Sequence, residues 1–507
     1  MRTLRHYVDR RAAEQPEATY LVAPETGATM TYAELQRASQ RLTRFLLGRG
    51  LAKGEKIALM LHNGYQTARL LLGVMYGGFT VAPLNLLSQR SQLAYVLGHS
   101  DTRLVFASAE LEPRVREALE GSQREVEIVT IDPDATAVLD ERALPDVPLP
   151  EPREEDDALL MYTSGTTGVP KGVLHTHRSV IAGGEYTSAA HRLAGGDRVL
   201  CALPLYHING QIVTAVAPLV HGGSVVMPHR FSVTNYWDLV AQHACTWINV
   251  VPTIVAYLLN GEDPRTRGVD ISRVKFCRSA SAPLPPGLHR AFEEKFGIGI
   301  IETFGMTETN APCFTNPYEP AQRRIGSPGQ AFGNEAKIVD PATGAQNPPR
   351  VAGEIMVRGD NVMKCYYKDA ESTARTLHPD GWMHSGDLGY LDEDGFLFVT
   401  GRIKELIIKG GENIAPREID EALLRHPAVL EAAAVGIPDA AYGQEIMACV
   451  VLKAGGGCTP AELTAFCEAE LGRYKTPKEI RILDALPKGP SGKVQRLKLL
   501  DPQGYSE

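Results

Sequence analysis

The chain has 507 residues, which is too long for one ordinary hydrophobic core, so we expect more than one domain. Hydrophobic residues make up 44% and charged residues 22%, the profile of a soluble globular protein. The formal net charge of −8 is small for this length and argues against nucleic-acid binding, which normally requires a basic face.

The cysteines, the N-terminus and the apolar segments predict a cytoplasmic protein without a membrane span. No two cysteines have C-x-x-C spacing and no histidine cluster accompanies them, so reduced and mostly buried thiols are expected. Residues 1–20 contain no apolar segment typical of a secretory leader. The most apolar run, residues 70–87, contains a glycine pair and a proline, which favours a helix followed by a strand over a membrane span.

The first elements alternate between helix and strand. Thr31 is a suitable N-cap for an amphipathic helix that begins at Tyr32. Residues 56–61 predict a short buried strand, residues 69–75 a helix and residues 79–84 a second strand. This alternation is typical of βαβ units and a parallel sheet.

The same alternation continues after an exposed connection rich in Pro, Asp and Glu, residues 132–157. Strands between helices are expected at residues 159–162, 198–203, 224–227, 246–251 and 274–277. Parts of this middle region are therefore expected to form a second sheeted lobe.

From about residue 325 the sequence pattern changes from alternating helices and strands to short strands separated by turns. Residues 335–340, 353–359 and 395–401 predict strands separated by turn sequences such as PATG and DEDG, which indicates a small antiparallel barrel or sheet. A compact α+β region follows, in which Pro416 suits the first turn of a helix.

The stretch TSGTTGVPKG, residues 163–172, follows a predicted strand. Its glycines let the backbone approach a ligand and present N–H groups, while hydroxyls and Lys171 add donors suited to phosphate. A flexible surface turn would explain only the glycines, so a nucleotide-phosphate loop is favoured. It is not a P-loop of the G-x-x-x-x-G-K-[ST] type, because Pro170 and Gly172 stand where that motif needs Gly and Ser or Thr, and an unrelated P-loop kinase is disfavoured.

The loop, within YTSGTTGVPKGV, resembles the phosphate-loop signature of the adenylate-forming superfamily, which includes acyl- and aryl-CoA synthetases, firefly luciferase and peptide-synthetase adenylation domains. Further segments resemble the motifs of this superfamily in the right order: LPLYHING, ETFGMTET, HSGDLG, GRIKELIIKGGENI and LPKGPSGKVQR. Together they span nearly the whole chain, which is identified as a member, an AMP-forming acyl-CoA synthetase.

The resemblance implies an α/β fold: a large N-terminal domain, residues 1–401, with two βαβ-type sheeted subdomains and a small β-barrel, and a small mobile α+β C-terminal domain, residues 402–507. The small domain would turn about Lys404, which from its residue type alone is an exposed linker lysine. Gly410 and Gly411 would then border the tunnel through which the thiol of coenzyme A reaches the adenylate.

The resemblance also implies how ATP binds. Phe304, where the superfamily more often has Tyr, would stack on adenine, and Asp387 would accept hydrogen bonds from the ribose hydroxyls. Thr307 would bond the α-phosphate and Glu308 would hold Mg²⁺, a hard ion that prefers oxygen ligands; Thr307 also suits a plain helix cap. The nucleotide and coenzyme set expected in this way is Thr163, Ser164, Gly165, Thr166, Thr167, Gly168, Lys171, Ala282, Pro283, Glu302, Thr303, Phe304, Asp387, Arg402, Gly410 and Gly411.

The catalytic set implied by the resemblance is Lys493, Thr307, Glu308 and His207. Lys493, which would otherwise be a solvated loop lysine, would lie beside the attacking carboxylate and the α-phosphate, where it would orient the acid and offset charge. His207 would gate the site next to that carboxylate.

The acid pocket is expected around residues with more polar groups than an alkyl tunnel needs: His207, Asn209, Gln211, Thr253, Ser279, Ala280, Gly305 and Thr309. These groups suit a substrate hydroxyl, amide or second carboxylate. Arg278 would pair with a second carboxylate unless it points elsewhere along its strand. The sequence texture looks like that of short- to medium-chain and carnitine-type CoA ligases, so a small or medium acid is expected.

The predicted activity is the ATP-dependent joining of a carboxylic acid to CoA through an acyl-adenylate, with AMP and pyrophosphate released. Other functions stay open: loading of a carrier protein instead of CoA, weak luciferase-type oxygenation, and non-catalytic nucleotide binding. A non-catalytic relative should lack Glu308, Asp387, Arg402 or Lys493, and all four are present. The expected partners are small molecules and no nucleic acid, and a homodimer is one assembly that the resemblance allows.

Overall fold

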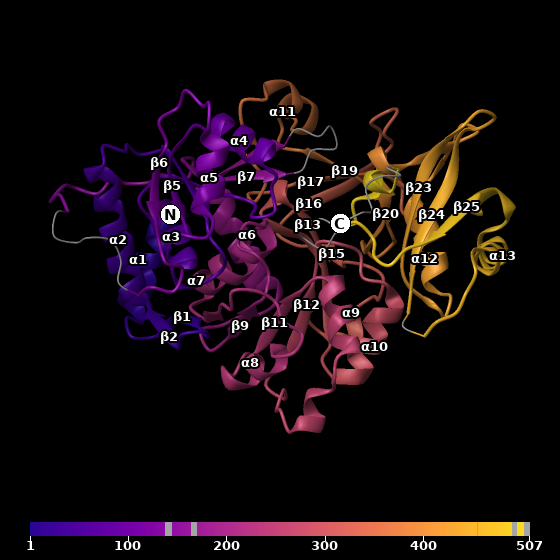
Figure 1. Cartoon of the computed structure of the whole chain (residues 1–507), viewed down its shortest axis with the longest axis horizontal. Helices are drawn as coiled ribbons and strands as arrows, with labels where there is room; N and C mark the ends of the chain where they lie inside the picture. The colour runs from indigo at the N-terminus through magenta and orange to yellow at the C-terminus, as the bar shows by residue number, and fades with distance from the viewer. Residues whose placement is uncertain (137–143, 164–169, 454, 489–493, 501–507) are drawn as a thin grey trace.

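The computed structural model describes residues 1–136, 144–163, 170–453, 455–488 and 494–500, and within these residues the strands form four sheets (Figure 1). The chain has a mixed α/β fold with a large N-terminal domain and a small C-terminal domain, which is yellow in the figure. No helix in the described part of the chain combines the length and the hydropathy that crossing a membrane requires. All eight cysteines lie in the described ranges as free thiols, and six of them are buried, as predicted.

The N-terminal part builds a mostly parallel sheet, here called the β3 sheet. The strand β3 pairs in parallel with β4 and β5, which confirms the predicted βαβ pattern. Its strand order is β18 (Cys365–Tyr366), β8 (Lys171–Thr176), β7 (Asp157–Thr163), β4 (Thr80–Pro83), β3 (Lys56–Met60), β5 (Thr102–Ala107) and β6 (Glu127–Thr130). The helices of this part are α1 (Leu4–Glu14), α2 (Tyr32–Gly48), α3 (Tyr65–Tyr76), α4 (Arg90–His99) and α5 (Glu112–Leu119).

The helix α2 begins where the sequence predicts. Thr31 Oγ1 accepts a hydrogen bond from the backbone N–H of Glu34 at 3.2 Å, and the Glu34 carboxylate accepts one from the N–H of Thr31 at 2.8 Å. This reciprocal pair satisfies two N–H groups that the helix itself leaves without partners. The buried face, which includes Leu35, Leu42 and Leu46, can then pack into the main hydrophobic core.

The second lobe is the β12 sheet. Its order is β15 (Gln330–Ala331), β14 (Ala311–Thr315), β13 (Ile300–Met306), β12 (Phe276–Ser279), β11 (Trp247–Val250), β9 (Arg198–Cys201), β10 (Ser224–Val226), β1 (Thr19–Ala23) and β2 (Ala28–Thr31). The helices are α6 (His177–Ala190), α7 (Ala217–His221), α8 (Tyr236–Gln242), α9 (Pro252–Asn260) and α10 (Pro286–Phe296), with a π-helix, η2, at Asn209–Val216.

One predicted strand of this sheet was placed too early. The sequence predicted residues 274–277, whereas β12 extends to Ser279. Cys277, Arg278 and Ser279 pair in parallel with Ile300, Ile301 and Glu302 of β13. The strand is therefore set by pairing with distant segments, and it carries Arg278 and Ser279 into the sheet.

The sequence predicts an antiparallel barrel or an antiparallel sheet after residue 325, and the structure has a sheet. Its order is β16 (Glu335–Val339), β17 (Gly353–Arg358), β19 (Met383–Leu391) and β20 (Leu397–Arg402), and all neighbours are antiparallel. The short helix α11 (Ala370–Thr376) precedes β19. Figure 1 shows this sheet between the β3 sheet and the C-terminal domain.

The C-terminal domain has its own sheet and its own hydrophobic clusters. The sheet order is β22 (Glu412–Ile414), β21 (Ile407–Lys409), β24 (Gly443–Leu452) and β23 (Val429–Asp439), and β25 (Glu479–Ile482) pairs with β24. The helices α12 (Pro416–Leu424) and α13 (Pro460–Leu471) accompany it, and α12 has Pro416 in its first turn as predicted. The two clusters contain only residues between 407 and 499. The exact boundary at 401/402 stays a prediction.

We predict that Thr31→Ala lowers the free energy of unfolding by about 1 kcal/mol, because the first turn of α2 loses its side-chain cap. Urea unfolding of the variant measures this change. Thr29→Ala, an equal change at an exposed position on the preceding strand, is the matched control. Equal stability of the two variants would contradict the capping role.

Candidate active site

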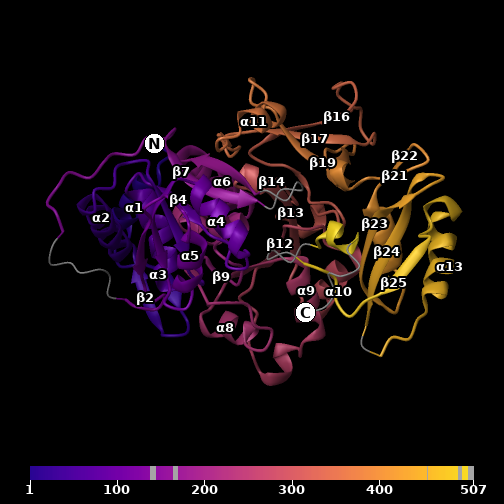
Figure 2. The same ribbon diagram turned by 45° about the horizontal axis from the view of Figure 1, so that its top comes forward.

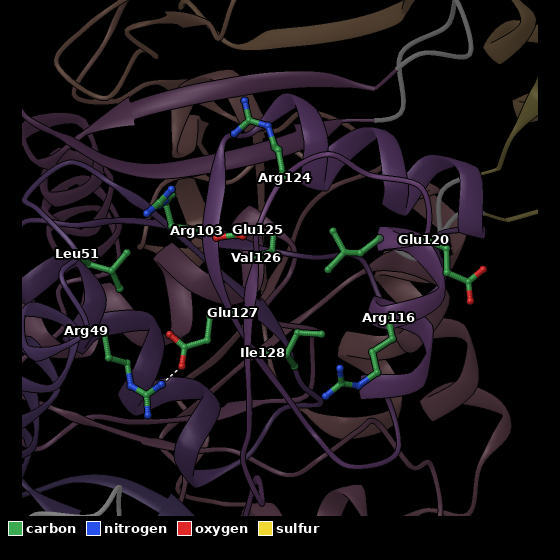
Figure 3. Close-up of a pocket in the computed structure, with 11 residues that line it drawn as sticks. Arg49, Leu51, Arg103, Arg116, Glu120, Arg124, Glu125, Val126, Glu127 and Ile128 are labelled. Carbon is green, nitrogen blue, oxygen red and sulfur yellow. Dashed lines mark ion pairs between the residues drawn. The ribbon is translucent and has the colours of Figure 1, made fainter.

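Two hollows on the described surface differ sharply in chemistry. The larger, of about 590 Å³, lies at the edge strand β6 and is lined by arginines and glutamates (Figure 3). Arg49 pairs with Glu127, Arg116 with Glu112 and Arg124 with Asp101. Because these charges are neutralised by neighbours, the hollow is a solvated ion-pair surface, and none of the predicted site residues lines it.

The second hollow is the acid-pocket candidate. It has a volume of about 370 Å³, within the usual range for small-ligand sites, and His207, Asn209 and Thr253 of the predicted acid set line it. Tyr206, of the LPLYHING motif, and Ser281 also line it, as does Phe231, which the sequence did not predict. The pocket lies beyond the carboxyl ends of the parallel strands β9 and β11, where ligands of open α/β sheets bind.

A chain of contacts connects Lys171 to Glu308. Lys171, the first residue of β8, donates from Nζ to Ser372 Oγ at 2.7 Å and lies over the Tyr366 ring, 4.8 Å from its centroid. The Tyr366 hydroxyl donates to Glu308 Oε1 at 2.9 Å. Burial and then the neighbouring Glu308 carboxylate raise the pKa of Tyr366, so the hydroxyl keeps the proton that it donates. Tyr366 and Ser372 were missed by the sequence analysis.

The predicted ribose carboxylate and its arginine lie opposite each other on neighbouring strands. Asp387 of β19 and Arg402 of β20 are direct cross-strand partners, and the guanidinium donates from Nε and Nη2 to the two carboxylate oxygens. The Asp387 carboxylate raises the pKa of Arg402, and the charges of Glu405 and Glu308 raise this pKa further. The Arg402–Asp387 pair therefore sits in the same electrostatic environment as Glu308.

The strand β13 delivers the residues of the ETFGMTET motif. Phe304 is half-buried and meets Phe314 edge-on with ring centroids 6.0 Å apart. Glu302 is buried, and its Oε1 accepts a hydrogen bond from the N–H of Leu284 at 3.2 Å, which ties down the loop that contains Ala282 and Pro283. Burial raises the pKa of Glu302, whose Oε2 has no partner within the described residues.

A buried imidazole supports the backbone at Thr307. His175 Nε2 lies 2.8 Å from the carbonyl oxygen of Thr307, and Asn310 donates from Nδ2 to His175 Nδ1 and to Ser179 Oγ. These contacts fix a neutral ring that donates from Nε2, and burial lowers the pKa of His175 to about 3. The sequence suggested Asn310 as a polar group of the acid pocket, but His175 and its contact with Asn310 were missed because the two residues lie 135 positions apart in the chain.

Other predicted acid-site residues lie away from the lining of the pocket. Gln211 is buried in η2 and donates to the carbonyl oxygen of Leu205, while the Thr309 hydroxyl caps its own short turn at Met306. Ser279 is buried at the end of β12, with Oγ unpartnered in the described chain, and Ala280 follows it. Gly305 of β13 pairs with Pro312. The contact of these five residues with an acid stays a prediction.

The remaining predicted residues lie at the ends of β7 and β8, on β13 and in turns. Thr163 and Lys171 face each other at the ends of β7 and β8, and Ser164, Gly165, Thr166, Thr167 and Gly168 between them lie outside the described residues, as does Lys493. Thr303 is buried on β13. Gly410 and Gly411 form the β21–β22 turn with φ of +56° and +87°, a conformation that favours glycine. Lys404 lies in the short turn after β20.

The chemistry of Glu308 fits a magnesium ion. Its half-buried carboxylate offers oxygen ligands, which Mg²⁺ prefers, and a bound nucleotide would supply further oxygens. No cluster of three or more His, Cys, Asp and Glu side chains in the described ranges could hold a metal by itself. A site with one carboxylate plus phosphate oxygens is the usual arrangement for this ion.

The chain matches two family models and many relatives. Residues 8–367 match the AMP-binding enzyme family and residues 418–493 match the AMP-binding enzyme C-terminal domain. A sulfoacetate–CoA ligase of Cupriavidus necator is 55% identical over 98% of this chain and 97% of that protein. An oxalate–CoA ligase of Arabidopsis thaliana is 35% identical over 92% of each chain. The solved O-succinylbenzoate coenzyme A synthetase of Bacillus subtilis, in complex with ATP and magnesium ion, has a TM-score of 0.85 at 31% identity, covering 98% of this chain and 99% of that one.

We predict that Tyr366→Phe weakens ATP binding in magnesium buffer by about 3- to 30-fold, because Glu308 loses the hydroxyl that orients it while the ring under Lys171 remains. Isothermal titration with ATP measures the affinity. Tyr367→Phe is the matched control, because the Tyr367 hydroxyl bonds Asp101 instead. An unchanged affinity for Tyr366→Phe, or an equal loss in the control, would be evidence against the Tyr366–Glu308 contact.

Proposed function

Because the chain belongs to the AMP-binding enzyme family, we propose that it is an ATP-dependent acid–CoA ligase whose acid is sulfoacetate or a similarly short acid with a second anionic group. The observation that carries the proposal is the 55% identity, over nearly the full length of both chains, to a protein named for sulfoacetate. The small, partly polar pocket supports it, because 370 Å³ suits a short acid better than a long alkyl chain.

In the first step, a carboxylate oxygen of the acid attacks the α-phosphorus of ATP, and the bond to pyrophosphate breaks. Lys171, positioned by Ser372 and the Tyr366 ring, offsets the charge that develops on the leaving phosphates. Glu308 would hold Mg²⁺, which when bound neutralises phosphate charge. Lys493 would hold the attacking carboxylate near the α-phosphate, a positioning and electrostatic role.

Asp387 would accept hydrogen bonds from the ribose hydroxyls. The guanidinium of Arg402 fixes the orientation of this carboxylate before ATP arrives, so little freedom is lost on binding. Phe304 would offer its half-buried ring to adenine.

In the second step, the thiol of CoA attacks the acyl carbon of the adenylate, AMP leaves with the bonding electron pair, and the thiol proton passes to solvent. A turn of the C-terminal domain about Lys404 would withdraw Lys493 and bring Gly410 and Gly411 to the adenylate. The positive φ of both glycines suits a turn that approaches a ligand closely without side chains. Cytoplasmic location and a homodimer remain predictions.

The test is pyrophosphate release from MgATP with a panel of acids, each with and without CoA. We expect fast release with sulfoacetate that requires CoA for turnover, slower release with oxalate and malonate, and the slowest with acetate and octanoate. Lys493→Ala should reduce adenylation by about 100-fold or more, while leaving thioester formation from a synthetic adenylate. Pyrophosphate release at the same rate with and without CoA would indicate a carrier-protein acceptor. Equal rates for acids with one and with two anionic groups would contradict the proposed substrate.

A further inference from the structure

A buried arginine stands behind the acid pocket without a carboxylate partner. Arg278 of β12 is 2% exposed, and within the described residues it forms no ion pair. Both of its hydrogen bonds leave from Nη1, to Asn209 Oδ1 and Asn249 Oδ1, each at 2.8 Å. Its Nε is buried and lacks a partner in the described chain.

This arrangement is costly for the protein without ligand. Buried guanidinium groups are normally paired with carboxylates, since two neutral amide oxygens replace only part of the hydration that a cation loses. Burial lowers the pKa of Arg278 to about 9. No acidic side chain in the described part of the chain offsets this charge.

Asn209 connects the buried guanidinium of Arg278 to the pocket by hydrogen bonds. The Asn209 oxygen accepts from Arg278 and from Asn249 Nδ2, and its Nδ2 donates to Ser281 Oγ at 3.1 Å. Asn209 and Ser281 line the pocket directly. The Arg278–Asn209–Ser281 series therefore connects a positive charge in a dry interior to donors on the pocket wall, where Coulomb attraction is screened weakly.

Position in the fold supports the same assignment. Asn209 begins the π-helix η2, an irregular helix type that often occurs at functional sites. Asn249 and Arg278 are register partners on the neighbouring strands β11 and β12, near their carboxyl ends. Ser281 follows at a φ of +74°, a conformation rarely adopted by serine. Irregular backbone therefore lies at the pocket wall, at Asn209 and Ser281, and the buried charge of Arg278 lies directly behind Asn209.

We propose that Arg278, with Asn209, is the specificity-determining receptor for the second anionic group of the acid, a sulfonate or carboxylate at the end opposite the reacting carboxylate. The inference rests on the proposed function and concerns the same pocket. Arg278 does not take part in bond making; it is a positioning residue that favours acids with two anionic ends over acids with one. Asn209 lines the pocket and Arg278 lies behind it, so the charge of Arg278 acts on the oxygens of a sulfonate or carboxylate through the Asn209 side chain that it holds.

The test is the ratio of kcat/KM for sulfoacetate to kcat/KM for propionate, measured for the wild type, Arg278→Met and Arg278→Gln. We expect the ratio to fall on the order of 100-fold or more in both variants, mainly through KM for sulfoacetate, with KM for ATP unchanged. Malonate should lose rate like sulfoacetate. A ratio that stays within about 3-fold of wild type would overturn the proposal.

Thermal unfolding without ligand separates specificity from structure. Because no residue that the structure describes is a counter-ion for the buried Arg278, its replacement by Met should leave Tm unchanged or raise it. A large drop in Tm together with equal losses for both acids would assign Arg278 a structural role and overturn the proposal. Arg230→Gln is the matched control, because Arg230 is an exposed arginine that lines the same pocket. If this control alone removed the preference, the receptor would be Arg230 and not Arg278.

The outcomes also separate the inference from the proposed function. If the wild type does not turn over sulfoacetate or malonate at all, the proposed substrate class is wrong and Arg278 has no second anion to bind. If the wild type prefers sulfoacetate and both Arg278 variants keep that preference, the proposed function stands and only the receptor assignment fails.

Discussion

The contact between Tyr366 and Glu308 holds the candidate site together. Glu308 follows β13 of the β12 sheet, whereas Tyr366 lies on β18, a strand at the edge of the β3 sheet. Lys171 lies over the ring of Tyr366 and begins β8, to which β18 is paired. The Tyr366 side chain thus contacts the carboxylate of one lobe with its hydroxyl and the lysine of the other with its ring, and the nucleotide phosphates are expected between them. Figure 2 shows β13 and β14 between the indigo and purple N-terminal elements and the yellow C-terminal domain.

The charged groups of the candidate site hold one another in place. Arg402 clamps Asp387 across neighbouring strands, Tyr366 holds Glu308, and a neutral His175 supports the backbone of Thr307. Groups fixed in this way would need little reorganisation in the proposed reaction, which is how preorganised charges contribute to electrostatic catalysis. The acid pocket differs in the proposal for Arg278, because there the counter-charge to the arginine comes from the second anionic group of the bound acid.

Local signals predicted much of the fold. The N-cap at Thr31, the strand at residues 56–61 and Pro416 in the first turn of α12 were each predictable, because they depend on neighbouring residues. The extension of β12 to Ser279 was not, because its register is set by pairing with β13. For the same reason, the sequence left open which way Arg278 points.

The motif residues of the site were predicted through their resemblance to a superfamily, and their partners were not. Tyr366 and Ser372 belong to no quoted motif, and they meet Lys171 only after about 200 residues of chain have folded. Asn249 likewise reaches Arg278 only through the pairing of β11 with β12. Sequence patterns identify which side chains carry chemistry, whereas the contacts that orient them depend on long-range pairing that periodicity does not encode.

The most direct test of the account is a crystal structure of the protein with AMP and sulfoacetate bound. We expect the carboxylate at the α-phosphate end of the pocket and the sulfonate within hydrogen-bond distance of Asn209 or Arg278, with Glu308 still bonded to Tyr366. A sulfonate that lies at Arg230 or in solvent, with Arg278 bonded only to the two asparagines, would contradict it.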